Sequence, residues 1–298
     1  MKPAPASSEP STPTNLLLGS VLMLAAMTLL PIMDGLAKGL SESYPVTQIV
    51  WARYFFHFAF MVPVLLLRYR LRSLVPKRLG LQLLRGGLLL AATVLFFFGL
   101  SMLPQATVLA LFFVSPAVVT VLAPWLLGES VGRWRVVAVI VGFLGVILIL
   151  RPGTAAVGWG AGLAIAAGVI HGFYMMYTRR LAGSAPPLVT LGYTAVIGAL
   201  VMSVLMPFVW VPPKPGDFGV MVTLGVLAAG GHFLLIKAFD HAPANWLAPL
   251  GYAEMVTAVI YGYLAYGHLP DAYTWAGIAV IVGAGLWISL RERRLAAR

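Results

Sequence analysis

The chain repeats itself, and each repeat contains an odd number of long apolar segments. Residues 138–142 (AVIVG) recur unchanged 141 residues later as residues 279–283. The same offset aligns Trp134 with Trp275. Each half contains five apolar stretches, so the second half must enter a membrane in the opposite orientation to the first. The sequence therefore predicts two inverted repeats with a ligand site between them, near the middle of the membrane.

The composition favours an all-α membrane protein with ten transmembrane helices. Hydrophobic residues make up 60% of the 298 residues and charged residues only 10%, whereas soluble domains carry about 25% charged residues. Each apolar stretch is long enough to cross a hydrocarbon core of about 30 Å as a helix. We expect spans at residues 15–38, 45–67, 81–102, 107–127, 134–150, 159–178, 187–210, 218–239, 245–266 and 274–290.

Four segments follow from this pattern. Residues 1–14 are rich in Pro, Ser and Thr and are expected to be disordered. Residues 15–151 form the first five-helix repeat, residues 159–290 form the second, and residues 291–298 form a basic tail.

The net charge of +11 comes from arginines and lysines that gather on one side of the predicted membrane. They follow spans 2, 4, 6 and 10, and the opposite loops hold only Lys38, Arg151 and Lys214. The positive-inside rule then places both termini in the cytoplasm, and this distribution argues against nucleic acid as a partner. The chain contains no cysteine, which excludes disulfides and thiolate metal sites.

Two charged residues lie deep in predicted spans, where a charge costs at least about 2.5 kcal/mol and needs a partner or a function. Glu254 lies about eight residues into its span, among small and polar neighbours. We predict that it is a substrate ligand or a proton-coupling carboxylate. Arg53 lies at similar depth with His57 one turn further on, so its guanidinium must meet Glu254, Asp34 or the substrate. A fixed structural ion pair is the alternative for both charges.

Asp34 and Lys38 are one helical turn apart near the outer end of the first span. One interpretation is a self-contained ion pair whose lysine reaches the membrane interface. The other places both residues in an outer gate or in proton coupling.

Three prolines interrupt predicted spans and are candidate hinges beside a cavity: Pro31, Pro116 and Pro249. The repeat offset aligns Gly172, next to His171, with Pro31. We therefore expect corresponding breaks in the first and sixth spans, because broken helices mark binding sites in inverted-repeat proteins. Ordinary packing kinks are the alternative.

Histidines and tyrosines on small or polar helix faces complete the candidate substrate site. His171 and Tyr174 share a face of span 6, and His232 lies on a small-residue face of span 8. Tyr252 and Tyr261 lie on the Glu254 face and are candidates to stack on a substrate ring.

No catalytic, metal-binding or nucleotide-binding motif is present. The sequence has no His-Glu-x-x-His, no Gly-x-Ser-x-Gly and no phosphate-binding glycine loop. These absences argue against an enzyme, a metal site, a cofactor and an ATP-driven pump.

Five segments resemble the drug/metabolite transporter superfamily, specifically its ten-helix EamA-type carriers. They are residues 33–38 (MDGLAK), 50–57 (VWARYFFH), 127–129 (LGE), 248–254 (APLGYAE) and 291–294 (RERR). Among these carriers the chain looks most similar to S-adenosylmethionine uptake and riboflavin transporters. The resemblance implies a central cavity lined by helices 1–4 and 6–9, with helices 5 and 10 outside it. One departure is that His268 follows Gly267, where the second repeat commonly carries an acid.

The sequence thus predicts a secondary transporter that moves a small organic metabolite, such as S-adenosylmethionine or riboflavin, by alternating access. The resemblance implies a location in a bacterial inner membrane. A proton is a candidate coupling ion, and a homodimer is a possible assembly. An exporter of amino acids or cationic drugs is one alternative. A non-transporting membrane interaction protein is another.

Overall fold

The computed structural model describes residues 15–70, 74–76, 78–127, 132–151, 158–181 and 183–296. Within these ranges the chain is helical and contains no strand. The predicted disorder of residues 1–14 and the last two residues of the predicted basic tail lie outside the described residues.

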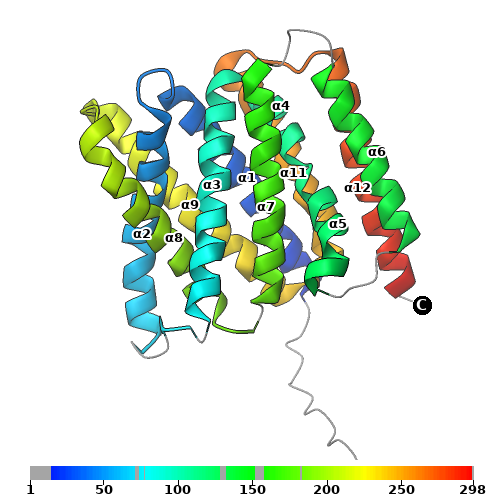
Figure 1. Cartoon of the computed structure of the whole chain (residues 1–298), viewed down its shortest axis with the longest axis horizontal. Coiled ribbons are helices and arrows are strands. Elements are labelled where there is room, and N and C mark those ends of the chain that lie inside the picture. The colour runs from blue at the N-terminus through cyan, green and yellow to red at the C-terminus, as the bar shows by residue number, and fades with distance from the viewer. Residues whose placement is uncertain are drawn as a thin grey trace, which may run out of the picture.

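The helices divide into two sets that correspond to the two sequence repeats (Figure 1). The first set is α1 (Leu16–Leu40), α2 (Val46–Arg68), α3 (Leu79–Met102), α4 (Gln105–Phe112), α5 (Ser115–Leu127) and α6 (Arg133–Leu150). The second is α7 (Gly158–Arg180), α8 (Pro187–Val209), α9 (Pro215–His241), α10 (Ala244–Leu247), η2 (Ala248–Tyr252), α11 (Ala253–Tyr266) and α12 (Ala272–Ala296). Nine spans in the described ranges are long and apolar enough to cross a membrane, counting α4 and α5 as one.

Helix packing relates the two halves by an approximate twofold axis. Helix α1 packs on α9, and α3 packs on α7, which is the same pair with the halves exchanged. Helix α2 packs on its counterpart α8, and α6 packs on its counterpart α12. The repeated prolines Pro45 and Pro186 precede α2 and α8 with φ of −57° and −56°. This arrangement confirms the predicted all-α fold of two inverted repeats.

The fourth span of each half is broken. Helix α4 ends at Phe112 and α5 begins at Ser115, with Pro116 in its first turn. In the second half, the 3₁₀ segment η2 contains Pro249 and separates α10 from α11. The ninth expected span is therefore three shorter pieces, and two of the three candidate hinge prolines lie at real breaks.

The expected breaks in the first and sixth spans are absent. Helix α1 continues through Pro31 and α7 continues through His171 and Gly172. Gln105 at the start of α4 donates its amide Nε2–H to the carbonyl oxygen of Pro31 at 2.6 Å, which links α4 to α1 at the proline. The prediction of paired breaks at these two positions was wrong.

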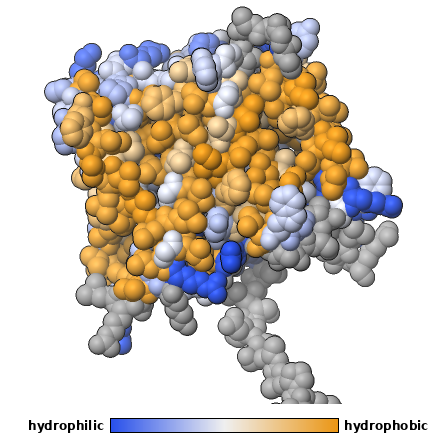
Figure 2. Space-filling view, in the orientation of Figure 1, coloured by the Kyte–Doolittle hydropathy of each residue, from blue (hydrophilic) through white to orange (hydrophobic). Residues whose placement is uncertain are grey.

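Helices α6 and α12 pack against each other at one edge of the bundle, and the remaining helices surround the interior (Figure 1). The close contact depends on glycine: a Cβ at Gly145 would lie 2.8 Å from the carbonyl oxygen of Gly277. Figure 2 shows a broad apolar surface over the middle of the bundle, with polar residues concentrated toward its two ends. This distribution is the one expected of a protein surrounded by lipid.

Candidate functional site

Arg53 on α2 points into the interior and is only 6% exposed. Its Nη1 donates a hydrogen bond to the hydroxyl of Thr93 on α3 at 3.2 Å, and its guanidinium lies 4.9 Å from the ring centre of Tyr54. Its Nε has no hydrogen-bond partner. Since a buried guanidinium normally uses its fork of donors, one donor of Arg53 stays available to a ligand.

His57 lies one turn beyond Arg53, and its ring faces that of His232 on α9. The ring centres are 6.0 Å apart with the planes nearly perpendicular. His57 Nε2 and His232 Nδ1 are buried without hydrogen-bond partners. The absence of a side chain at Gly225 lets α9 approach this close, since a Cβ there would lie 2.6 Å from the backbone nitrogen of His57. The structure thus brings three of the predicted site residues together.

The two intramembrane acids lie on two other helices, Asp34 on α1 and Glu254 on α11. Asp34 is buried and Glu254 is partly buried, and neither carboxylate forms a hydrogen bond to the described chain. The charge of Asp34 interacts through space with those of Arg53 and Glu254. Arg53 therefore has acids nearby, as the sequence predicts, but without a direct ion pair to fix it.

Arg85 on α3 is a buried cation that the sequence analysis missed. Its Nε donates to the hydroxyl of Thr178 at 2.8 Å and its Nη2 to the hydroxyl of Tyr174 at 2.8 Å. Its Nη1 donates to the Thr194 hydroxyl at 2.8 Å and to the Thr190 carbonyl at 3.2 Å. All these partners are neutral, so the hydrogen bonds hold α3, α7 and α8 together without neutralising the charge.

The signal that could have found Arg85 was present in the sequence but was not used. It is the seventh residue of α3, close to the end that the positive-inside rule associates with arginines. The sequence also offered hydroxyl partners. Thr178 lies one turn from Tyr174, and Thr190 and Thr194 lie one turn apart.

His171 and Tyr174 lie beside Arg85. Their ring centres are 5.3 Å apart, and the guanidinium of Arg85 lies 4.7 Å from the ring centre of Tyr174. Four residues lie near enough to His232 to interact with it electrostatically: Arg53, His57, Arg85 and His171. The basic groups of the interior are therefore on α2, α3, α7 and α9, and its two acids are on α1 and α11.

Lys38 does not pair with Asp34. Its Nζ donates instead to the carbonyl oxygens of Leu100 at 2.8 Å and Leu103 at 2.9 Å, at the C-terminal end of α3. These carbonyls have no partners within their own helix, and the negative end of the helix dipole attracts the ammonium. The predicted i,i+4 ion pair was therefore wrong, and Lys38 fastens α1 to α3.

The two remaining tyrosines have different environments. Tyr261 packs against Gly35 of α1, directly beside Asp34 in the chain. Tyr252 stacks on Phe113 with ring centres 5.4 Å apart, and its hydroxyl lies against Gly285 of α12. Tyr252 therefore lines a cavity next to α12, and its role in stacking on a substrate ring stays a prediction. Within the described ranges no three metal-ligating side chains are grouped.

Comparison with known proteins supports the architecture from outside this chain. The EamA-like transporter family matches residues 17–151 and again residues 158–290. A crystal structure with 21% sequence identity aligns with a TM-score of 0.67 and covers 93% of this chain and 98% of its own, which shows a shared fold.

Three curated relatives share 26% identity with nearly the whole chain. An S-adenosylmethionine uptake transporter of Rickettsia prowazekii aligns over 93% of this chain and 94% of its own length. A riboflavin transporter of Rhizobium johnstonii aligns over 95% and 94%. A pseudopaline exporter of Pseudomonas aeruginosa aligns over 92% and 97%.

Proposed function

Because the chain belongs to the EamA-like transporter family, we propose that it is a secondary active transporter that moves a small organic metabolite by alternating access. The proposal includes a bacterial inner membrane and cytoplasmic termini, since the basic loops gather on the side of both ends of the chain. Family membership leaves no support for the alternative of a non-transporting interaction protein.

The observation that carries the substrate class is a set of buried opposite charges that lack direct partners. Arg53 keeps an unpartnered Nε donor, and Asp34 and Glu254 keep carboxylates without hydrogen bonds. Buried charges of this kind are costly unless a ligand completes them. A substrate with an anionic group and a cationic or donor-rich group would satisfy both kinds of charge at once.

S-adenosylmethionine fits this description because it combines a carboxylate with cationic groups and an adenine ring. The uptake transporter of Rickettsia prowazekii supports this choice, and the riboflavin transporter supports a larger ring-bearing substrate. His171, Tyr174 and Phe112 offer a stack of rings beside the charges, with His171 4.8 Å from Phe112 and 5.3 Å from Tyr174 between ring centres.

Glu254 is the proposed proton carrier, and Pro116 and Pro249 are the proposed hinges. A carboxylate in the interior with no hydrogen bond to hold its proton can gain and lose it as the cavity changes exposure. The 3₁₀ segment around Pro249 directly precedes Glu254, so a change at this break would move the carboxylate.

Counterflow in proteoliposomes tests the proposal, because exchange needs neither the right direction nor the right driving force. Vesicles loaded with unlabelled S-adenosylmethionine, riboflavin or an amino acid would each be tested with the same labelled compound outside. We expect saturable accumulation of one label, and at least a tenfold loss in Arg53→Gln, because a charge-assisted contact is worth about 1.5–3 kcal/mol. Folded protein that accumulates none of these labels would contradict the proposed substrate class.

Export is a second candidate, favoured by the equally similar pseudopaline exporter. Alternating access is reversible, so direction depends on the coupling gradient and not on the binding residues. Uptake into inside-out membrane vesicles, but not into right-side-out vesicles, under an imposed proton gradient would assign export.

A further inference from the structure

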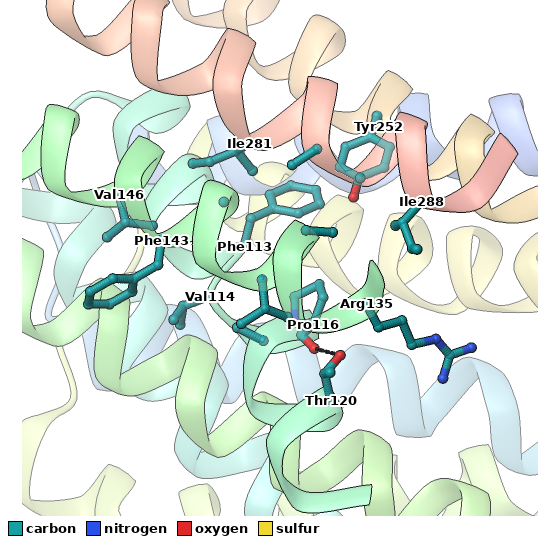
Figure 3. Close-up of a pocket in the computed structure, with 16 residues that line it drawn as sticks. Phe113, Val114, Pro116, Thr120, Arg135, Phe143, Val146, Tyr252, Ile281 and Ile288 are labelled. Atoms are coloured by element: carbon teal, nitrogen blue, oxygen red, sulfur yellow. Dashed lines mark hydrogen bonds between the residues drawn. The ribbon is translucent and has the colours of Figure 1, made fainter. Parts of the chain in front are cut away.

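A cavity of about 140 Å³ lies between α5, α6, η2 and α12 (Figure 3). None of its lining residues belongs to the charged interior. Most of the lining is apolar, including Phe113, Pro116, Phe143, Val146, Ile281 and Ile288. Pro116 and Phe143 are also exposed on the outer surface of the bundle. The cavity therefore opens sideways, toward the region that lipid chains occupy in a membrane.

Stacked aromatic rings form the wall of this cavity on the side of η2. Phe113 and Tyr252 are 5.4 Å apart between ring centres and nearly parallel, and the Tyr252 hydroxyl lies against Gly285 of α12. Figure 3 labels both rings among the residues that line the cavity. The apolar cavity and the charged interior are therefore built from different side chains.

A basic aromatic cluster adjoins the cavity where α6 begins and α12 ends. Two guanidiniums lie near the indole of Trp134, those of Arg133 at 5.3 Å and Arg291 at 5.0 Å from its ring centre. Trp287 packs edge-to-face on Trp134 at 5.6 Å. Arg135 and Ile288, the next residues in the chain after the two tryptophans, both line the cavity. Two cations beside one indole favour an anion in their vicinity.

We propose that this cavity binds an acyl chain of an anionic phospholipid, whose phosphate lies against Arg133 and Arg291. The apolar lining suits a hydrocarbon chain, and the two arginines suit the headgroup at the end of the same cavity. Basic pockets between transmembrane helices select acidic headgroups, and tryptophans favour the depth at which headgroups lie. Zwitterionic lipids lack the net charge that the two arginines would select.

Two matched glycine variants test the apolar part of the site. Gly142 lines the cavity, and a Cβ there would meet no heavy atom within 4 Å, so Gly142→Leu fills the cavity without a clash at its Cβ. Gly283 is its equivalent in the other repeat, also with open space around its Cβ but outside the cavity lining. Gly283→Leu therefore adds the same side chain to the outer surface as a control.

The measurement is native mass spectrometry of the purified full chain, delipidated and incubated with phosphatidylglycerol or phosphatidylcholine. We expect selective retention of phosphatidylglycerol by the wild type and by Gly283→Leu. Gly142→Leu should retain about tenfold less, which is the factor expected when about two methylene groups stay unburied.

Charge variants test the headgroup part and keep the proposal testable if Gly142→Leu fails to fold. The double variant Arg133→Gln/Arg291→Gln should lose the preference for phosphatidylglycerol, whereas Arg68→Gln at the exposed end of α2 should keep it. Equal retention of both lipids by the wild type would overturn the proposal. A Gly142→Leu variant that retains as much phosphatidylglycerol as the wild type would also overturn it. This holds even if that variant loses counterflow.

Discussion

Gly35 of α1 lies directly under the ring of Tyr261 of α11, so that any Cβ at position 35 would overlap the ring. Further along α11, the hydroxyl of Tyr266 donates to the carbonyl oxygen of the same Gly35 at 2.5 Å. These contacts close the space between α1 and α11 on the side where Lys38 fastens α1 to α3. Asp34 and Glu254 lie on these same two helices, so this packing sets the distance between the two carboxylates.

Gly35→Ala should destabilise the protein and weaken transport together. The new methyl group must push Tyr261 and α11 away, and overpacking of this kind typically costs about 1–3 kcal/mol. Thermal unfolding in detergent should show a lower Tm, and counterflow should fall. Gly87→Ala is the matched control, because Gly87 is also inside a helix but has open space where the Cβ would lie. A Gly35→Ala variant as stable and active as Gly87→Ala would show that the close contact is unimportant.

Glu254→Gln should separate coupling from exchange. The amide preserves the shape of the side chain but cannot carry a proton, so we expect accumulation driven by a pH gradient to fall at least tenfold while counterflow persists. Paired gradient-driven and counterflow measurements on the same vesicles provide the test. Glu42→Gln, at an exposed position after α1, should change neither. Full gradient-driven accumulation by Glu254→Gln would rule out Glu254 as the proton carrier.

Arg85→Gln should act mainly on stability. The guanidinium makes four hydrogen bonds to groups on α7 and α8, and such bonds average about 0.6 kcal/mol each inside membrane proteins. We expect a loss of about 2 kcal/mol in unfolding free energy, seen as a lower Tm. Arg78→Gln removes an exposed arginine just before the same helix and should leave the Tm unchanged. An unchanged Tm in Arg85→Gln would mean that water or neighbouring groups replace these bonds.

Much of the fold was predictable because lipid imposes simple rules. The repeat, the count of apolar stretches and the one-sided distribution of basic residues each depend on sequence alone. Local breaks were less predictable. Proline removes a backbone donor equally at Pro31, Pro116 and Pro249, yet α1 stays continuous at Pro31. The amide of Gln105, 74 positions away, binds the carbonyl oxygen of Pro31, a contact that no local pattern reveals.

The candidate site was predictable where burial alone made a residue costly. Arg53 and Glu254 attract attention at the centre of a span, and the structure keeps the side chain of Arg53 buried and that of Glu254 partly buried. Side-chain direction was not predictable in the same way. Tyr252 precedes Glu254 by only two residues, but the 3₁₀ geometry of η2 turns its ring toward α12. Lys38 could pair with Asp34 in sequence, but its actual partners are carbonyl oxygens at the end of α3. Only the packing of α1 against α3 reveals them.

The connection between the two outer helices should depend on pH in the acidic range. Asp271 accepts a hydrogen bond from the backbone N–H of Thr274 at 2.8 Å and pairs with Arg151 at the end of α6. The backbone N–H of Thr274, followed by Arg151, lowers the pKa of Asp271 below its usual value of 3.8. A carboxylate with a lowered pKa in the folded protein stabilises the fold above its unfolded pKa and loses that contribution as the pH falls through the folded pKa.

Asp271→Asn should therefore lower the Tm at pH 6 and converge with the wild type as the pH falls through the folded pKa of Asp271, which lies below 3.8. The difference at pH 6 should be small, at most about 1 kcal/mol, because half of the Asp271 side chain is exposed and solvent screens the pair. Thermal unfolding of both proteins at several pH values measures the difference curve directly, and titrations shared by both proteins cancel.

Asp240→Asn is the matched control, since Asp240 forms a similarly exposed pair with Lys237 on the single helix α9 and connects no two helices. Equal Tm values of Asp271→Asn and the wild type at pH 6 would show that the carboxylate does not stabilise the contact between α6 and α12.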